Sequence, residues 1–359
     1  MPESFWRGKR VLVTGHTGFK GAWLSLWLRR LGAVLTGYAL PPPTDPSLFQ
    51  LARVSEGLTS VTGDVRDLEH LTNVLRAARP EVVFHLAAQA LVRPSYDDPV
   101  GTFSTNVLGT VNILEAVRQV DGIRVVVNVT SDKCYENRGE RRGLREEDPL
   151  GGHDPYSSSK ACAEIVTASY RRSFFGASKA GTEPVAVASA RAGNVIGGGD
   201  WAVDRLVPDC MRALMAGRPI RIRNPDAVRP WQFVLEPLGG YLRLAERLWS
   251  GGQEYAGAWN FGPAERDAAP VRRIADRMVE HWANGTSWVQ EPGEHPHEAP
   301  YLRLDCAKAR DRLGWSPRTD LDQALAWVVR WYTDYRSGRD MRDATIEQIG
   351  EFMEMGKTP

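Results

Sequence analysis

Three evenly spaced glycines near the start of the chain constrain the fold more than any other feature. Gly15, Gly18 and Gly21 follow the apolar run RVLVT and lead into the helical pattern GAWLSLWLRRLGA. Glycines between a strand and a helix permit a tight turn and a close approach of the backbone to a ligand. The helix that follows offers free N–H groups and its positive dipole end to a pyrophosphate. In this position the motif predicts a dinucleotide-binding site rather than a turn that binds nothing.

The rest of the first half alternates between apolar runs and helical patterns. Residues 33–40, 81–89 and 124–131 are typical of strands, and residues 70–80 and 102–119 are typical of helices. Strands that are apolar at nearly every position, separated by helices, predict a parallel sheet covered on both faces. We therefore expect an α/β protein with a doubly wound (Rossmann) parallel sheet.

The second half of the chain is less regular. A strand ending in glycines (183–201) is followed by proline-punctuated segments at 219–233 and 291–305, and a helical pattern covers 322–338. These segments predict a smaller α/β lobe that binds the substrate. We expect the dinucleotide-binding domain to comprise residues 1–197 and 231–258, and the substrate domain to comprise residues 198–230 and 259–345.

Charge and cysteine content exclude several other classes. The formal net charge of +1 gives no bulk attraction to nucleic acid or to an acidic membrane surface. No apolar run approaches the ~20 residues of a membrane helix, and the chain starts without a signal-peptide pattern. The four cysteines form no CxxC pair, which favours reduced thiols in the cytoplasm. We expect no metal, because the HxH pair His295 and His297 lacks a third ligand nearby.

The adenosine end of the predicted site lacks its usual acid. Residues 33–40 contain no Asp or Glu to grip the ribose, and no Arg to meet a 2′-phosphate. Because no Arg is present to bind the 2′-phosphate of NADP, the sequence favours NAD as the cofactor. Asp64 and Val65 suit the adenine edge, and the small residues Ala87 and Ala88 suit a close approach to the cofactor. A surface Asp and a tightly packed strand end are the alternative explanations.

A cluster that can handle protons follows in the sequence. Tyr156 and Lys160 are four residues apart, so they share one face of a helix. A Lys beside a phenol favours the phenolate and lowers its pKa, as a base near neutral pH requires. The segment Thr130–Lys133 ends an apolar strand with two hydroxyls, an acid and an amine. Such a segment is either a solvated turn or a proton-handling group at the carboxyl end of a parallel strand.

Together these features resemble the extended branch of the short-chain dehydrogenase/reductase superfamily. The resemblance implies that Ser131 orients the C4 hydroxyl of a sugar, Tyr156 is the base, and Lys160 is its partner and anchors the cofactor ribose. Asn106 resembles the helix Asn that supports the active-site wall. The cofactor contacts implied for NAD are Gly15, His16, Thr17, Gly18, Phe19, Gly21, Asp64, Val65, Leu86, Ala87, Ala88, Asn106, Thr130, Tyr156 and Lys160.

Within this branch, the Asp132–Lys133 pair resembles sugar-nucleotide 4,6-dehydratases, because epimerases carry no acid–base pair after the hydroxyl. Most such dehydratases have an acid at the second position. The Asp–Lys variant, and long blocks such as GHTGFKGAWLSLWL, are similar to members that act on CDP-glucose. The implied reaction oxidises C4, removes the C5 proton and the C6 hydroxyl, and returns the hydride to C6.

The base that removes the C5 proton has two candidates. A Lys at its reference pKa of about 10.4 is protonated, so Lys133 requires a lowered pKa. Asp132 raises this pKa, whereas burial, Lys160 and the positive nicotinamide ring lower it. We expect the lowering effects to prevail once the site closes around the substrate. Glu136 is the alternative base.

A nucleoside-diphosphate sugar also needs cations and amide donors. The resemblance assigns diphosphate contacts to Asn194 and Arg229, and the forked guanidinium suits phosphate. For Arg93 and Ser95 a role in stabilising the loop is equally compatible with the sequence. The further candidates for substrate binding are Arg93, Ser95, Arg205, Arg221, Asn260 and Tyr301.

The helical patterns at 102–119 and 156–174 carry apolar stripes, which in this branch pack across a homodimer interface. They are equally suited to covering the sheet, and a homodimer or a dimer of dimers is expected on the resemblance alone.

Two alternative functions remain open at this point. One is a different nucleotide-sugar 4,6-dehydratase or 4-epimerase, and the other is a catalytically inactive, NAD-sensing regulatory protein.

Overall fold

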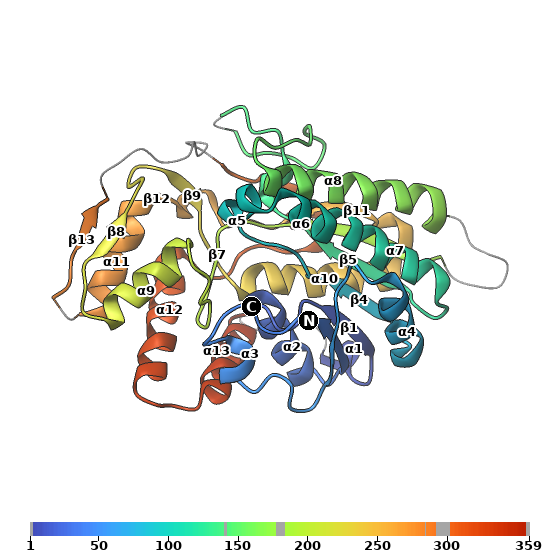
Figure 1. The fold of residues 1–359 in the computed structure, drawn as a ribbon, viewed down its shortest axis with the longest axis horizontal. Helices are drawn as coiled ribbons and strands as arrows, with labels where there is room; N and C mark the ends of the chain where they lie inside the picture. Colours follow the sequence, from blue (N-terminus) through green and yellow to red (C-terminus); the bar gives the residue numbers. More distant parts are fainter. Residues whose placement is uncertain (1–2, 140–141, 177–183, 284, 292–301, 357–359) are drawn as a thin grey trace.

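The computed structural model describes residues 3–139, 142–176, 184–283, 285–291 and 302–356, and its centre is a parallel sheet of seven strands (Figure 1). The strand order is β11-β6-β5-β4-β1-β2-β3, which confirms the doubly wound fold. The chain runs outward from β1 to β3 and then returns to the other side of β1, so the switch point lies between β1 and β4. The strands are β1 (Arg10–Thr14), β2 (Val34–Ala39), β3 (Thr59–Thr62), β4 (Val82–His85), β5 (Val125–Val129), β6 (Ala186–Arg191) and β11 (Gly257–Asn260).

Two helical layers cover the sheet because successive strand residues point to opposite faces. Val11 and Val13 belong to one core cluster, and Leu12 between them belongs to the other. The first layer contains α2 (Phe19–Arg30) and α10 (Leu235–Gly251). The second contains α4 (Leu68–Ala78), α7 (Gly109–Gln119) and α8 (Pro155–Tyr170), with α5 (Val92–Asp97), α6 (Pro99–Phe103) and the π-helical turn η1 (Ser104–Leu108) beside α8.

The second half builds a smaller lobe from short paired strands and helices, at the left of Figure 1. Strand β8 pairs with β13, β9 with β12, and β7 with β10. The segment 219–233 therefore contains three short strands and is not a plain loop. These elements are β7 (Val195–Ile196), α9 (Leu206–Met215), β8 (Ile220–Ile222), β9 (Val228–Pro230), β10 (Gln232–Phe233), β12 (Ala268–Pro270), α11 (Val271–Trp282), β13 (Trp288–Gln290) and α12 (Leu321–Arg336). The residue boundaries of the two domains remain a prediction.

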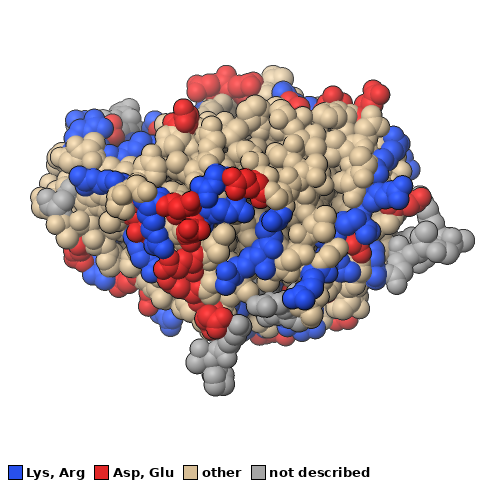
Figure 2. Space-filling view, turned by 90° about the horizontal axis from the view of Figure 1, so that it is seen from below, with Lys and Arg blue, Asp and Glu red and all other residues tan. Residues whose placement is uncertain are grey.

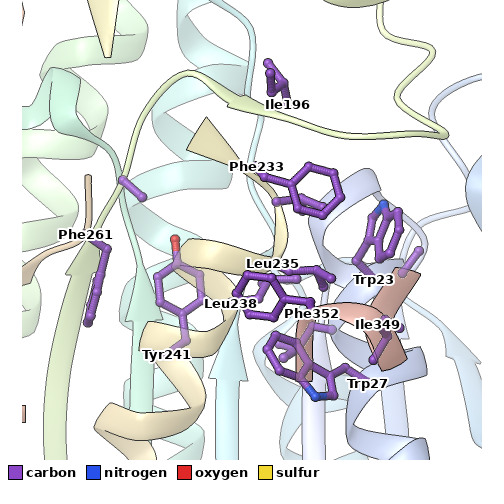
Figure 3. Packing of buried hydrophobic residues seen from close by; sticks show 14 of the residues in the cluster. Trp23, Trp27, Ile196, Phe233, Leu235, Leu238, Tyr241, Phe261, Ile349 and Phe352 are labelled. Atoms are coloured by element: carbon purple, nitrogen blue, oxygen red, sulfur yellow. The ribbon is translucent and has the colours of Figure 1, made fainter. Parts of the chain in front are cut away.

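A last helix, α13 (Met341–Met355), packs against α2 and α12 and lies beyond the terminal helix that the sequence predicted. The rings of Trp27 and Phe352 meet edge to face at 5.6 Å, in the cluster shown in Figure 3. The four tryptophans of α2 and α12 are buried: Trp23, Trp27, Trp327 and Trp331. The remaining short elements are α1 (Glu3–Trp6), α3 (Leu48–Leu51), η2 (Asp132–Cys134), η3 (Arg171–Phe175), η4 (Gly252–Glu254), η5 (Glu265–Asp267) and η6 (Ala309–Leu313).

The described part of the chain contains no helix that is both long enough and apolar enough to cross a membrane. On the face shown in Figure 2, Lys and Arg side chains are mixed with Asp and Glu side chains, in keeping with the net charge of +1.

Candidate active site

The glycine motif lies at the switch point of the sheet and packs tightly. Gly15 has φ +75°, and a Cβ there would lie 2.7 Å from the backbone N of Ala87, after β4. A Cβ on Gly21 would lie 2.1 Å from the carbonyl oxygen of Gly15. Gly18 caps α2 without a side-chain hydrogen bond, so the first turn keeps N–H groups for a ligand. These features fit a bound pyrophosphate, as the sequence predicted.

His16 and Thr17 tie the motif to the neighbouring strands. The His16 ring is buried, and its Nε2 lies 2.8 Å from the Ser60 hydroxyl. Burial lowers the pKa of His16 to about 4, so the ring is neutral near pH 7. Thr17 donates a hydrogen bond to the carbonyl oxygen of Leu40, just after β2. Phe19 lies close to Gly197 in the glycine-rich loop after β6.

The residues predicted at the adenine edge and the active-site wall lie along the same sheet edge. The Asp64 carboxylate pairs with Arg66 at 2.5 Å, which lowers the pKa of Asp64, and Val65 is buried. Leu86, Ala87 and Ala88 follow β4 and are half-buried.

Asn106 lies in η1, and its side chain connects the segment after β4 with α8 through hydrogen bonds. Its side chain donates hydrogen bonds to the Ser159 hydroxyl (2.8 Å) and to the Gln89 carbonyl, and it accepts one from the Gln89 backbone N–H. The π-helical turn that carries Asn106 is a form often found at functional sites. Asn106 therefore joins the segment after β4 to α8.

Tyr156 and Lys160 lie on the first turns of α8 and are almost fully buried. The helix begins where the sequence dictates, because Asp154 accepts a hydrogen bond from the Ser157 N–H and Pro155 occupies the first position. The Tyr156 backbone N–H donates to the Ser95 hydroxyl at 3.2 Å. Ser131 lies beside the Tyr156 phenol and lowers its pKa. The Ser131 hydroxyl and the Tyr156 phenol therefore lie together, and Lys160 follows Tyr156 by about one turn of the same helix.

The electrostatics of the phenol differ from the expectation. Burial raises the pKa of Tyr156 to about 12 and outweighs the nearby hydroxyl and cation that lower it. The cation that lowers it is Arg205, whereas Lys160 was expected in that role. Burial also lowers the pKa of Lys160 to about 8. The expectation treated the ammonium as fully effective and left out the loss of solvation by the phenol.

Asp132 occupies η2, directly after β5, and is 2% exposed. Its carboxyl accepts hydrogen bonds from the Ser131 hydroxyl at 3.1 Å and the Asn194 side-chain amide at 3.4 Å. Burial raises the pKa of Asp132, although Lys133, Arg229 and Lys20 lower it. A carboxyl that keeps its proton to higher pH is suited to donate that proton to a leaving hydroxyl.

Lys20 is a site residue that the sequence reading missed. It is the second residue of α2, and its ammonium lies 5.9 Å from the centroid of the Tyr241 ring. Burial and the charges of Lys160 and Arg205 lower the pKa of Lys20 to about 7. A cation in the first turn of a helix opposes the helix dipole. That unfavourable placement is the signal in the sequence that could have revealed it.

The two candidate C5 bases differ in their surroundings. Lys133 is half-buried within η2, next to Asp132. Glu136 pairs with Arg138 at 3.1 Å, and its side chain is 42% exposed. The choice of Lys133 over Glu136 as the C5 base stays a prediction.

The predicted substrate residues separate into two groups. Three of them lie around the acid and the phenol. The Asn194 amide bonds to the Asp132 carboxyl, and Arg229 lowers the pKa of that carboxyl. Arg205 lowers the pKa of Tyr156. Arg205 also pairs with Asp200 at 3.0 Å.

The other predicted substrate residues are engaged elsewhere. Arg93 pairs with Asp204 at 3.0 Å, and Ser95 is fully buried and donates to the Val92 carbonyl, so the loop-stabilising alternative describes both. Arg221 points to solvent on β8. Asn260 is fully buried, and its amide is used by protein groups. Tyr301, like His295 and His297, lies outside the described residues.

The described residues contain no group of three or more His, Cys, Asp or Glu side chains placed to hold a metal ion.

Comparisons with known proteins match nearly the whole chain. The family model for GDP-mannose 4,6 dehydratase matches residues 12–327. CDP-glucose 4,6-dehydratase of Salmonella typhimurium is 52% identical over 351 residues, which is 98% of both chains. A dTDP-glucose 4,6-dehydratase from Streptomyces venezuelae, solved with NAD bound, superposes with a TM-score of 0.77 at 23% identity, over 93% of this chain and 99% of that one. UDP-glucose 4-epimerase of Thermotoga maritima gives a TM-score of 0.79 at 21% identity, over 91% and 99%.

Proposed function

Because this chain belongs to the GDP-mannose 4,6-dehydratase family of extended short-chain dehydrogenases/reductases, we propose that it dehydrates CDP-D-glucose to CDP-4-keto-6-deoxy-D-glucose. It is an NAD-dependent sugar-nucleotide dehydratase, a hydro-lyase. The observation that carries the substrate and the reaction is the buried Asp132, hydrogen-bonded to Ser131 and followed directly by Lys133, beside Tyr156. That acid–amine pair supplies the two groups that an elimination needs beyond C4 oxidation, namely a proton donor for the C6 hydroxyl and a base for the C5 proton.

The glycine motif and the wall after β4 hold the NAD. Gly15, Gly18 and the first turn of α2 would hold the pyrophosphate. Lys160 would anchor the nicotinamide ribose. When bound, NAD accepts a hydride from the sugar and returns it later in the same turnover. No acid closes β2, so the adenosine ribose relies on the segments that follow β2 and β3.

The side chains of the protein then manage the protons. Tyr156 takes the proton of the C4 hydroxyl, which Ser131 orients. The resulting 4-ketone acidifies the C5 proton, which Lys133 removes, and Asp132 gives its proton to the C6 hydroxyl so that it leaves as water. C5 regains a proton from the protonated base when C6 receives the hydride. The proton that Tyr156 took then returns to Asp132 through solvent, so both groups are reset and the net change is the loss of one water.

The diphosphate lies against Asn194 and Arg229 in this proposal, with Arg205 at the sugar end. Arg229 is 9% exposed on β9, and its charge reaches Asp132. The same cation therefore steadies the phosphates and disfavours the neutral form of the acid, so substrate binding and proton donation are coupled.

The test is to incubate the purified protein with CDP-, UDP- and dTDP-glucose. A product lighter than the substrate by one water and a 4-keto chromophore in alkali are expected with CDP-glucose. An unchanged mass with a changed sugar configuration would instead indicate a 4-epimerase, and reaction with another nucleotide alone would indicate a different dehydratase. If reduced nicotinamide never forms with any of the three, the NAD-sensing regulatory function would replace the proposal.

A further test separates the two candidate bases. Lys133→Met should abolish incorporation of solvent deuterium at C5, because no amine is left to remove that proton. Full turnover in Lys133→Met would transfer the role to Glu136 or to another group.

We further infer a cytoplasmic homodimer or dimer of dimers. The four cysteines are unpaired, as in reducing compartments. Val100 and Leu108, on α6 and η1, are 77% and 55% exposed, and Ile165 on α8 is 58% exposed. Large apolar side chains gathered on neighbouring helices favour a protein interface over solvent. Sedimentation of the purified protein tests this, and a monomer at micromolar concentration would contradict it.

A further inference from the structure

Four buried side chains form a continuous chain of hydrogen bonds beneath the catalytic segment. The Thr130 hydroxyl donates to Glu164 Oε1 at 2.5 Å, and Arg191 Nη2 donates to Glu164 Oε2 at 2.8 Å. Arg191 Nη1 donates to the Tyr135 hydroxyl at 2.7 Å. All four residues are at most 4% exposed. We call Thr130, Glu164, Arg191 and Tyr135 the buried clamp.

The buried clamp spans the residues that carry the elimination chemistry. Thr130 and Tyr135 are the two ends of the segment that contains Ser131, Asp132 and Lys133. Thr130 and Tyr135 are therefore connected twice. One connection is the backbone of the catalytic segment, and the other is the hydrogen-bonded Glu164–Arg191 pair, so the two together form a closed ring. Because Glu164 lies on α8 one turn after Lys160, the ring also joins this segment to the helix that carries the base.

The two ends of the segment are not held equally. Thr130 continues from β5, and its backbone N–H donates to the Ala190 carbonyl of β6 at 2.9 Å. Tyr135 lies beyond the single turn of η2, outside the central sheet. There its neighbours pair with the segment around Leu150, since the Glu136 N–H donates to the Pro149 carbonyl and the Gly151 N–H donates to the Cys134 carbonyl, each at 2.9 Å. The Tyr135 hydroxyl receives the Arg191 bond and donates to Asn260 Oδ1 at 2.7 Å. The phenol thus supplies two side-chain bonds at the end of the segment that the central sheet does not hold.

A stabilising role alone does not account for a buried ion pair of this kind. Burying an Arg and a Glu costs desolvation energy that their attraction only roughly repays, and apolar replacements are often as stable. The hydrogen bonds that Glu164 accepts from Thr130, Ser189 and Arg191 offset the desolvation of its carboxylate and lower its pKa. What the arrangement fixes is geometry, since the planar guanidinium reaches Glu164 and Tyr135 at once.

We propose that Tyr135 and Arg191 are positioning residues for the elimination step, holding η2 so that Asp132 and Lys133 face C6 and C5 of the sugar. This inference rests on the proposed function. Oxidation at C4 uses Ser131 and Tyr156, which lie at the end held by the sheet and on α8. Loosening the Tyr135 end therefore affects water loss more than it affects oxidation.

The experiment compares Tyr135→Phe with the wild type as holoenzymes in single turnovers with CDP-glucose. Tyr135→Phe keeps the ring and removes both hydrogen bonds of the hydroxyl. We expect water loss and C5 deuterium incorporation to slow about tenfold, the equivalent of one buried hydrogen bond. The appearance of reduced nicotinamide, which reports C4 oxidation, should stay close to the wild-type rate, so that the 4-keto-glucose intermediate accumulates.

Thr345→Val is the matched control, because it removes a buried hydroxyl on α13 that donates to the Met341 carbonyl and accepts from Trp331 Nε1. It should lower the melting temperature similarly and keep the wild-type ratio of the two rates. Arg191→Lys is a second variant, which keeps the charge opposite Glu164 but cannot reach Tyr135 at the same time. It should change the ratio in the same direction as Tyr135→Phe.

An equal slowing of both steps in Tyr135→Phe, or no change in either, overturns the positioning role and leaves the proposed function standing. Failure of the wild type to form the keto product from CDP-glucose removes the proposed function itself, and the inference with it. If Arg191→Lys does not fold, the ratio measured in Tyr135→Phe decides alone.

Discussion

The carboxyl of Asp132 fits against a backbone that leaves no room for a side chain. A Cβ on Gly193 would lie 1.8 Å from Asp132 Oδ2, although the φ of Gly193 is ordinary for any residue. Glycine at this position is therefore needed for the close approach of the acid and not for a special turn. The next residue, Asn194, has φ +48° and bonds to the same carboxyl.

Gly193→Ala should displace the Asp132 carboxyl and lower kcat by about 100-fold, a loss typical of a misplaced catalytic group. The measurement is keto-product formation at saturating CDP-glucose, with a thermal melt to show that the protein is folded. Gly176→Ala is the control, because the nearest atom to its added Cβ is 3.4 Å away. Activity of Gly193→Ala near that of the control would mean that Asp132 is not the acid.

Arg205 should set the pH at which the phenol works. Its charge lowers the pKa of Tyr156, and the active form of the base is the phenolate, which is populated above that pKa. Arg205→Met should raise the pKa and move the rising limb of the kcat profile to higher pH. Arg218→Met, which removes an exposed charge after α9, should leave the profile in place. A shift to lower pH, or no shift, in Arg205→Met would refute this role.

Single residues also show where sequence reasoning reaches its limit. Helix spacing placed Tyr156 and Lys160 on one face, and the strand end placed Ser131 and Asp132 at the edge of the sheet. The family resemblance was needed to bring the two pairs together. It could not be foreseen that protein groups use every hydrogen-bonding atom of the Asn260 side-chain amide. Its partners come from segments more than 40 residues away on either side. Whether a polar side chain faces a ligand or the protein depends on such contacts.

At the scale of elements, α8 carries the base, its Lys partner and the buried Glu164 on one helix. Its start depends on Asp154, which bonds to the N–H and the hydroxyl of Ser157. The sequence holds this cap in full, as DPYSS, so the position of Tyr156 in the first turn was predictable. The π-helical turn η1 was not, because nothing in STNVL marks a departure from the α-helix.

Asp154→Ala should destabilise the protein by about 0.5–2 kcal/mol, the usual cost of a lost helix cap. It should also reduce kcat, because Tyr156 lies only two residues beyond the cap. Asp340→Ala removes the equivalent cap of α13, far from the site, and is the matched control. Urea unfolding and kcat together test this, and equal kcat values in the two variants would show that the start of α8 does not position the base.

At the scale of the whole molecule, α13 completes the core around α2. Its buried residues Met341, Thr345, Gln348 and Phe352 recur every three or four positions. The sequence therefore contained the helical signal, but polar residues make up much of the stripe and hid it. The parallel sheet was predictable, because its strands are continuously apolar, whereas the two- and three-residue strands of the smaller lobe are too short to leave a pattern.

Phe352→Ala should lower the free energy of unfolding by about 3–5 kcal/mol, because it leaves a cavity against Trp27. Urea unfolding measures the loss, with Val289→Ala on the exposed edge of β13 as a control that should change little. A loss in Phe352→Ala no larger than in the control would mean that α13 is only loosely attached.

The packing of α13 on α2 also bears on how the protein is made. The ribosome completes α2, with the glycine motif at its start, long before it completes α13. Until those later residues emerge, the indole of Trp27 lacks part of its cover, and the nascent chain has to keep that apolar surface from associating with other chains. Nucleotide capture by the growing polypeptide is thus expected to become stable only after α13 has emerged.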